Sequence, residues 1–417
     1  MCRPKFPLVS AFFWRGLGSL LAGASGRVQR ANSTQATIAL FILALCGGAA
    51  RAQEVDSDRP FRFYGHFSPT VLTVDDGASR STEAADNANS GGRIGFWYQR
   101  GLGANTLKFN GEISLGVRLS GSLSQLSDPP LFDWNEQSVR KFEAILETPK
   151  FGTFSIGQGS MGSDGVTESD LSGTTLASYV GIADVAGGYF FRTETGALSA
   201  IRIQDAYPTF DGGRSQRVRY DSPELSLSKL GSLKFGASIG TESTDGNVTL
   251  NDALSDAGLF YRNQLGNWTM AGSVGVSIAE TSQGNEPQIA GSFSILHEAS
   301  GLSLTTASGS RDHNGSYIFT KVGIRGNWFQ VGGTSVSFDW YESTNTVVSG
   351  SQARSIGIGV VQHLSKQNLD LFFGVRKYEY DGGSLVQYRD MTSAMVGVRW
   401  VFRRLEERTI FEDLWDK

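Results

Sequence analysis

The chain has 417 residues, a formal net charge of −4 and only 19% charged residues. Glycine is abundant (52 residues), proline is scarce (10), and aromatic residues reach 11%, a composition that favours strands and turns over helices. A mean hydropathy of −0.18 excludes a bundle of membrane helices, so the chain holds either several soluble domains or one large all-β unit.

The first 52 residues are typical of an export signal, since they contain six Lys or Arg residues and no acid. Within them, a basic stretch leads into the apolar run ATIALFILALCGGAARA. The alternative interpretation of this run is a membrane anchor, but the run is short for one. The run ends in an A-x-A pattern at residues 50–52, so we expect cleavage before Gln53. Cleavage would remove six cations and no acid, which takes the formal charge from −4 to −10. It would also remove both cysteines, Cys2 and Cys46, and with them any disulfide or cysteine-ligated metal.

From residue 61 to residue 402 one pattern recurs, in which two strands of alternating polarity are joined by a turn and followed by a longer loop. In LKFNGEISLGVRL (107–119), Leu107 and Phe109 share one face, whereas Lys108 and Asn110 share the other. This period-two order is typical of half-buried strands. We predict sixteen strands, over residues 61–74, 91–99, 105–119, 140–148, 152–160, 216–224, 232–240, 255–263, 267–279, 288–297, 301–309, 317–328, 333–343, 353–363, 368–380 and 391–402.

The connections between these strands alternate in length. Those after even strands are mostly short, whereas those after odd strands are mostly longer and polar, the extreme being residues 161–215. The segment GYFFRTETGALSAIRI (188–203) could add a strand pair and raise the number from sixteen to eighteen. We assign it to the long loop, because the alternation of short and long connections then stays in phase.

The closing segment MVGVRWVF (395–402) indicates which strand face points outward. Val396, Val398, Trp400 and Phe402 share an apolar face, and the opposite face has Arg399. A soluble β-sandwich would bury the apolar face, but the second faces hold too many small and charged residues for that. A closed antiparallel barrel in an outer membrane turns the apolar face to lipid, with aromatics at headgroup level and the charge in a watery lumen. Closure also pairs every backbone group, as hydrocarbon requires. A β-solenoid, the other alternative, would show a fixed short repeat, which the chain lacks.

Five motifs occur in order along this barrel: FRFYGHFSPTVLTVDDG (61–77), GGRIGFWYQRGLG (91–103), KFGTFSIGQGSMGSDG (150–165), RVRYDSPEL (217–225) and GVRWVF (397–402). With sixteen strands and an oversized third long loop, the chain resembles the Gram-negative general porins of α-proteobacterial type. The resemblance implies a homotrimer of water-filled barrels in the outer membrane, surrounded by lipid and lipopolysaccharide. It further implies passive diffusion of ions and small hydrophilic solutes, with no nucleic-acid partner and no enzyme activity.

In that family the third long loop folds into the lumen, where its acids face basic side chains on the opposite wall. The matching loop here is 161–214, and the acids expected at the constriction are Asp164, Glu168, Asp170 and Asp184. By strand parity, the basic side chains that point inward are Arg62, Arg93, Lys108, Arg118, Arg217 and Arg219. Opposed charges across a pore set up a transverse field that orients dipolar solutes and filters ions. For each residue the alternative is a solvated lumen charge away from the narrowest point.

The end of the chain departs from the family pattern, in which the chain stops at a terminal aromatic that the assembly machinery recognises. We take Trp400 and Phe402 as this barrel-closing signal and 53–402 as the barrel domain, although residues 403–417 follow. This tail is expected on the periplasmic side, either as a short amphipathic helix or as a disordered extension.

Other activities have weaker support in the sequence. The histidines lie far apart, so we expect no metal site and no catalytic residues. An outer-membrane hydrolase would have to use His313, which lies beside Asp312. A channel specific for sugars, phosphate or dicarboxylates is the nearer alternative, but Trp97, Tyr341 and Phe372 are too scattered for a sugar track. We expect no cofactor, apart from divalent cations that acidic loops such as residues 74–87 could bind and that would bridge lipopolysaccharide.

Overall fold

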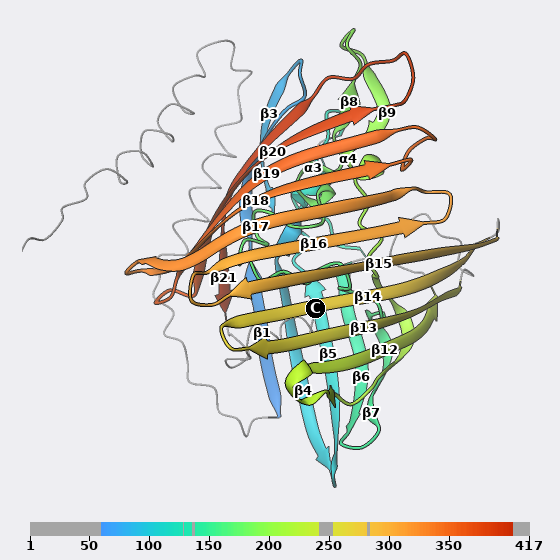
Figure 1. Cartoon of the computed structure of the whole chain (residues 1–417), viewed down its shortest axis with the longest axis vertical. Helices are drawn as coiled ribbons and strands as arrows, with labels where there is room; N and C mark the ends of the chain where they lie inside the picture. Colours follow the sequence, from blue (N-terminus) through green and yellow to red (C-terminus); the bar gives the residue numbers. More distant parts are fainter. Residues whose placement is uncertain (1–59, 128, 136–137, 242–252, 282–283, 403–417) are drawn as a thin grey trace, which may run out of the picture. The chain divides into compact units, whose positions relative to one another are not determined.

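The computed structural model describes residues 60–127, 129–135, 138–241, 253–281 and 284–402. Over these ranges the chain forms a closed antiparallel barrel of sixteen strands, which confirms the predicted fold (Figure 1). The first barrel strand consists of β1 (Phe61–Phe67) and β2 (Pro69–Asp75), and the second of β3 (Arg80–Asp86) and β4 (Arg93–Leu102). The predicted leader 1–52 and the predicted tail 403–417 lie outside the described residues.

The other fourteen barrel strands follow in chain order, each paired with its sequence neighbours. They are β5 (Asn105–Ser114), β6 (Val139–Thr148), β7 (Gly152–Ser160), β10 (Arg214–Asp221), β12 (Ser232–Thr241), β13 (Ala253–Leu265), β14 (Trp268–Thr281), β15 (Gly284–His297), β16 (Leu302–Arg311), β17 (Ser316–Phe329), β18 (Gly332–Thr344), β19 (Gln352–Leu364), β20 (Leu369–Asp381) and β21 (Met391–Phe402). A short strand, β11 (Leu225–Ser226), pairs with β12, and β8 (Phe190–Arg192) and β9 (Leu198–Arg202) form a separate hairpin.

The barrel closes between its last strand and its first. Strand β21 pairs with β1 through Phe67↔Trp400 and with β2 through Val71↔Val396. The rings of Phe67 and Trp400 stack at 5.8 Å, and Phe402 lies 5.5 Å from Phe67. A closed ladder leaves no edge strand in hydrocarbon, where an unpaired backbone group would cost several kcal/mol.

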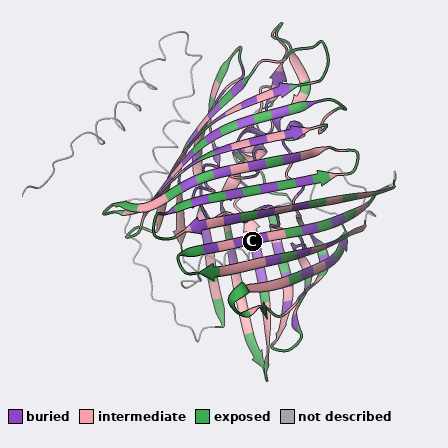
Figure 2. Cartoon of the chain, in the orientation of Figure 1, coloured by how far each residue is buried: buried purple, intermediate pink, exposed green. Residues whose placement is uncertain are grey.

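The barrel wall is apolar outside and polar inside, the reverse of a soluble protein. On β16, Leu302 and Leu304 are 56% and 48% exposed on the outer face, whereas Ser303 and Thr305 are buried on the inner face. Figure 2 shows the same alternation of buried and exposed residues along β15–β20. In the described residues no helix is long and apolar enough to cross a membrane. The exposed apolar residues on the outer face of the strands are typical of a surface that faces lipid.

The segment after β7, residues 161–213, packs largely against the inner face of the barrel, and we call it the lumenal loop. It contains two helical turns, α3 (Ala183–Ala186) and α4 (Ile203–Ala206), and the β8–β9 hairpin, which stays outside the barrel sheet as predicted (Figure 1). Its apolar side chains, such as Ile182 and Phe191, are fully buried and pack with inward aromatics that include Tyr341 and Tyr378. The largest apolar cluster of the described residues thus joins the loop to the wall.

The lumenal loop approaches the wall closely because small residues lie beneath it. A Cβ at Gly258 would stand 2.5 Å from the carbonyl oxygen of Gly162, and one at Gly359 would stand 2.7 Å from Cβ of Ser178. Wall serines supply hydrogen bonds in the same region, as where the Ser294 hydroxyl accepts from the Leu171 amide at 3.0 Å. The inward Gly and Ser residues of the alternating strands therefore form the surface on which the loop rests.

Two predictions about the first loops are wrong. Residues 74–87 are not a long loop, because β2 and β3 form a hairpin there; β3, with the sequence RSTEAAD, lacks the apolar alternation that indicates a lipid-facing strand. The third strand ends at Ser114 and not at residue 119, because Gly116 adopts a φ of +67°, which interrupts an extended strand. Three 3₁₀ turns complete the described elements: η1 (Ala88–Ser90), η2 (Ser120–Ser122) and η4 (Ser228–Leu230).

Candidate functional site

The lumenal loop begins at a fixed point on the wall. Asp256 of β13 accepts hydrogen bonds from the amide of Gly162 at 3.1 Å and from the amide of Ser163 at 2.7 Å. The Ser163 hydroxyl binds the same carboxylate, as does the hydroxyl of Ser238 on β12. These contacts fix the position of Asp164, the first of the predicted constriction acids.

Three of the predicted acids gather on the loop together with one that the sequence interpretation missed. We call Asp164, Glu168, Asp184 and Asp211 the loop carboxylates. Tyr179 donates a hydrogen bond to Glu168, and Asp211 accepts from the amides of Gly165 and Thr167 at 3.0 and 3.1 Å. The Glu168 carboxylate interacts electrostatically with each of the other three.

Asp164, Asp184 and Asp211 resist ionisation because they are enclosed and lie near other carboxylates. These groups belong to the loop and not to a membrane-spanning strand. Burial, with the charge of Glu168 in addition, raises the pKa of Asp184 to about 7. Burial and the neighbouring carboxylates also raise the pKa values of Asp164 and Asp211, although Arg214 works against the rise at Asp164. The charge of Asp184 therefore depends on pH in the neutral range.

Asp170, the fourth predicted acid, is held apart from this group. Its carboxylate binds the ammonium group of Lys321 on β17 at 2.6 Å, and the two side chains are 6% and 0% exposed. Burial opposes its ionisation, but the Lys321 charge nevertheless keeps the pKa of Asp170 below its usual value. Asp170 is thus an ion-paired group packed between the loop and the wall.

The predicted basic residues of β10 lie beside the start of the lumenal loop. Arg217 pairs closely with Glu143 of β6 and is almost fully buried. Arg219 binds Asp221 at 2.8 Å and donates to the carbonyl oxygens of Ser160 and Met161 at 3.1 and 2.7 Å. Arg219 also interacts electrostatically with Asp164, so the structure brings this predicted acid and this predicted base together.

A second basic group surrounds one carboxylate on the adjacent wall. Glu112 of β5 lies 2.7 Å from Arg140 and 3.7 Å from Arg93, and it accepts a hydrogen bond from Tyr64 at 2.9 Å. Arg140 and Arg93 also interact electrostatically with Arg214, which in turn acts on Asp164. The wall cations are therefore Arg93, Arg140, Arg214 and Arg219, of which the sequence interpretation identified the first and the last.

The remaining predicted bases have partners on neighbouring strands. Lys108 of β5 pairs with Glu147 of β6. Arg118 follows the end of β5 and binds Glu83 and the Ala84 carbonyl oxygen, each at 3.0 Å. Arg62 lies on β1, on the same face as Tyr64, whose hydroxyl binds Asn110 and Glu112 inside the barrel. The structure thus places the predicted bases along several strands and not at one level of the lumen.

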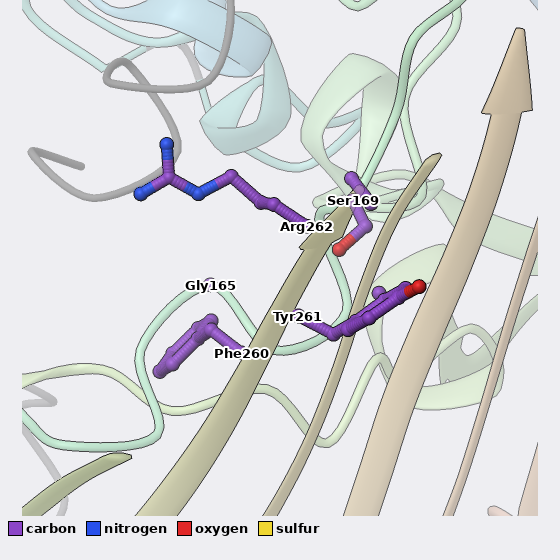
Figure 3. Close-up of a pocket in the computed structure, with 7 residues that line it drawn as sticks. Gly165, Ser169, Phe260, Tyr261 and Arg262 are labelled. Carbon is purple, nitrogen blue, oxygen red and sulfur yellow. The ribbon is translucent and has the colours of Figure 1, made fainter. Parts of the chain in front are cut away.

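A small hollow remains where the lumenal loop passes β13 and β14. Its lining consists of Gly165 and Ser169 from the loop, with Phe260, Tyr261, Arg262, Ala271 and Gly272 from the two strands (Figure 3). In Figure 3 the loop backbone at Gly165 runs beside the Phe260 side chain. The hollow therefore belongs to the packing of the loop on the wall.

The side chains considered for catalysis or cation binding lie in an exposed turn or in ion pairs. His313 is almost fully exposed in the turn between β16 and β17, 3.5 Å from Asp312. The described residues contain no group of three His, Cys, Asp or Glu residues that could hold a metal ion. In residues 74–87, Asp75 pairs with Arg80 and Asp76 pairs with Arg192.

Comparison with known proteins identifies the family. A family model described as Gram-negative porin matches residues 38–383. The chain belongs to the Gram-negative porin family. No curated protein matches it.

Solved structures share the barrel at low sequence identity. The anion-selective porin from Comamonas acidovorans is 15% identical, with 82% of this chain and 99% of that chain covered and a TM-score of 0.53. OmpF of Salmonella typhi in complex with daunomycin is 15% identical, with 84% and 100% covered and a TM-score of 0.53. OprB of Pseudomonas putida is 10% identical, with 83% and 95% covered and a TM-score of 0.55. Family and fold place this porin in the outer membrane and point to a channel, not an enzyme.

Proposed function

We propose that this porin is a general diffusion channel for ions and small hydrophilic solutes, with a charged constriction between the lumenal loop and the wall. The single observation that supports it is the opposition of the loop carboxylates and the wall cations, with Asp164 acting on Arg214 and Arg219. A transverse field between the two groups would orient dipolar solutes and select ions by charge.

The test is reconstitution in a planar bilayer, with the reversal potential measured in a KCl gradient. Neutralising two acids in Glu168→Gln/Asp184→Asn should shift the potential toward anion selectivity. Asp312→Asn is the matched control, because Asp312 is an acid exposed outside the lumen and its loss should change nothing. An unchanged potential in the double variant would remove the constriction from this position.

The same recordings distinguish the alternatives. A general channel gives currents that no single solute saturates, whereas saturable block by a sugar, phosphate or dicarboxylate would indicate a substrate-specific channel. His313→Ala should leave solute flux unchanged; loss of a measured hydrolysis in this variant would instead support the hydrolase.

We also propose a homotrimer in contact with lipid and lipopolysaccharide, as the family resemblance implies. Conductance in steps of three would support the trimer. Divalent cations bound by acidic loops are part of the same proposal, and chelation should then lower the thermal stability of the purified trimer.

A further inference from the structure

A row of four alternating charges crosses the inner wall beneath the lumenal loop. It consists of Asp170 on the loop, Lys321 on β17, Asp339 on β18 and Arg376 on β20, all of them buried or nearly so. Lys321 and Asp339 are direct cross-strand partners in the sheet. Arg376 reaches Asp339 at 2.7 Å past Gly357 of β19, where a Cβ would stand 2.5 Å from the guanidinium group.

Both inner members of this row bind the same loop residue. The Lys321 ammonium group donates to the Ser178 carbonyl oxygen as well as to Asp170, while Asp339 accepts from the Ser178 hydroxyl at 2.5 Å. Lys321 thereby spans the loop between residues 170 and 178. Arg376 contacts the wall at Ser355 and supplies the positive charge that pairs with the buried Asp339 carboxylate.

The charges of the row sum to zero, which has consequences for permeation. A carboxylate on the lumenal loop would ordinarily attract cations, but Asp170 is covered and neutralised by Lys321. Asp170 is thus an acid of the lumenal loop that fastens the loop to the wall.

We propose that Lys321 is a positioning residue that holds the lumenal loop against the wall and at the same time withdraws the Asp170 charge from the ion pathway. Arg376 supports it by pairing with Asp339, the second attachment of Ser178. The inference rests on the proposed channel function, since it assigns to these residues a role in the width and selectivity of that channel.

The two parts of this role can be separated by single-channel recording. Lys321→Met should raise open-channel current noise several-fold, because the loop loses its attachment. At alkaline pH, where the buried Asp170 carboxyl ionises without its counter-charge, the variant should also shift the reversal potential toward cations. Lys321→Met/Asp170→Asn should return the potential to the wild-type value but keep the noise. Lys321→Arg, which retains the cation, should restore both.

A disulfide supplies the complementary control. A Cβ on Gly323 of β17 would lie 3.0 Å from Cβ of Ser172, slightly closer than the usual distance of about 3.5–4.5 Å in disulfides, so a small loop shift suffices. The two natural cysteines lie at residues 2 and 46, in the predicted leader. Adding Ser172→Cys/Gly323→Cys to Lys321→Met should remove the noise under oxidising conditions without moving the potential, and reductant should bring the noise back.

Arg325→Met is the matched control, because it removes a different ion pair, that of Arg325 with Glu298, from the same strand β17. Lys321→Met channels with wild-type noise and wild-type reversal potential would overturn the inference. If Lys321→Met does not assemble, the double variant Lys321→Met/Asp170→Asn decides the question, because it buries no unpaired charge. Current noise at the wild-type level in this double variant would also overturn the positioning role. Absence of channels from the wild type would instead refute the proposed function.

Discussion

The carboxyl group of Asp184 should make the ion selectivity of the pore depend on pH near neutrality. Its pKa is raised to about 7 by burial and by Glu168. With that pKa the group is about 10% ionised at pH 6 and about 90% ionised at pH 8. Raising the pH across this range therefore adds nearly one negative charge per pore to the loop, so cation selectivity should increase with pH.

Reversal potentials in a KCl gradient at pH 6, 7 and 8 measure this change, and Asp184→Asn is the variant that should abolish the step centred near pH 7. Glu168, Tyr179 and Tyr378 are the titratable groups that interact with Asp184, and none of them is removed by this substitution. Any slope that remains in Asp184→Asn then belongs to other titratable groups, among them Asp164 and Asp211. A wild-type potential that is flat from pH 6 to 8, or a step of equal size in Asp184→Asn, would refute the reasoning.

Three further outcomes follow from the packing of the loop. Arg376→Met should lower the stability of the barrel by about 3–5 kcal/mol, because it leaves Asp339 buried without its counter-charge, and a lower thermal unfolding temperature in detergent would show it. Gly258→Val should displace the start of the loop and alter conductance, because the new Cβ would collide with the Gly162 carbonyl oxygen. Gly101→Val is the control and should leave conductance unchanged, because a Cβ at Gly101 meets no atom within 4 Å. Asp256→Asn should increase current noise, as it weakens the contacts with the amides of Gly162 and Ser163, and a quiet channel would contradict that role.

The barrel could be predicted from the sequence because strand alternation is a local signal. The polarity of Leu302, Ser303 and Leu304 shows which strand face each occupies, without knowledge of the adjacent strands. Sixteen such segments indicate the barrel. The hairpin β2–β3 escaped prediction because RSTEAAD has no apolar face to alternate with a polar one. Backbone pairing with β2 holds this strand in place, and sequence polarity does not report pairing.

The proposed constriction was only partly predictable, because strand parity shows that a side chain points inward but not what it meets there. Asp170 and Asp164 look alike in the sequence, yet one is paired with Lys321 and the other faces Arg214 and Arg219. Which acid lies over which strand depends on how the loop is laid across the wall. The inward parity of Lys321 was visible in the sequence; its contact with a residue 151 positions away was not.

The strict alternation along the strands separates two demands on the chain. Outward positions need only be apolar, so one aliphatic residue can replace another there at little cost. Substitutions at inward positions can change which solutes permeate without disturbing the contact with lipid. Two such barrels can therefore drift until few identical residues remain and still superpose over most of their length, as the 15% identity with the Comamonas acidovorans porin illustrates. In this architecture, substitutions on the inward face of a strand can change permeability, while the outward face preserves insertion into the membrane.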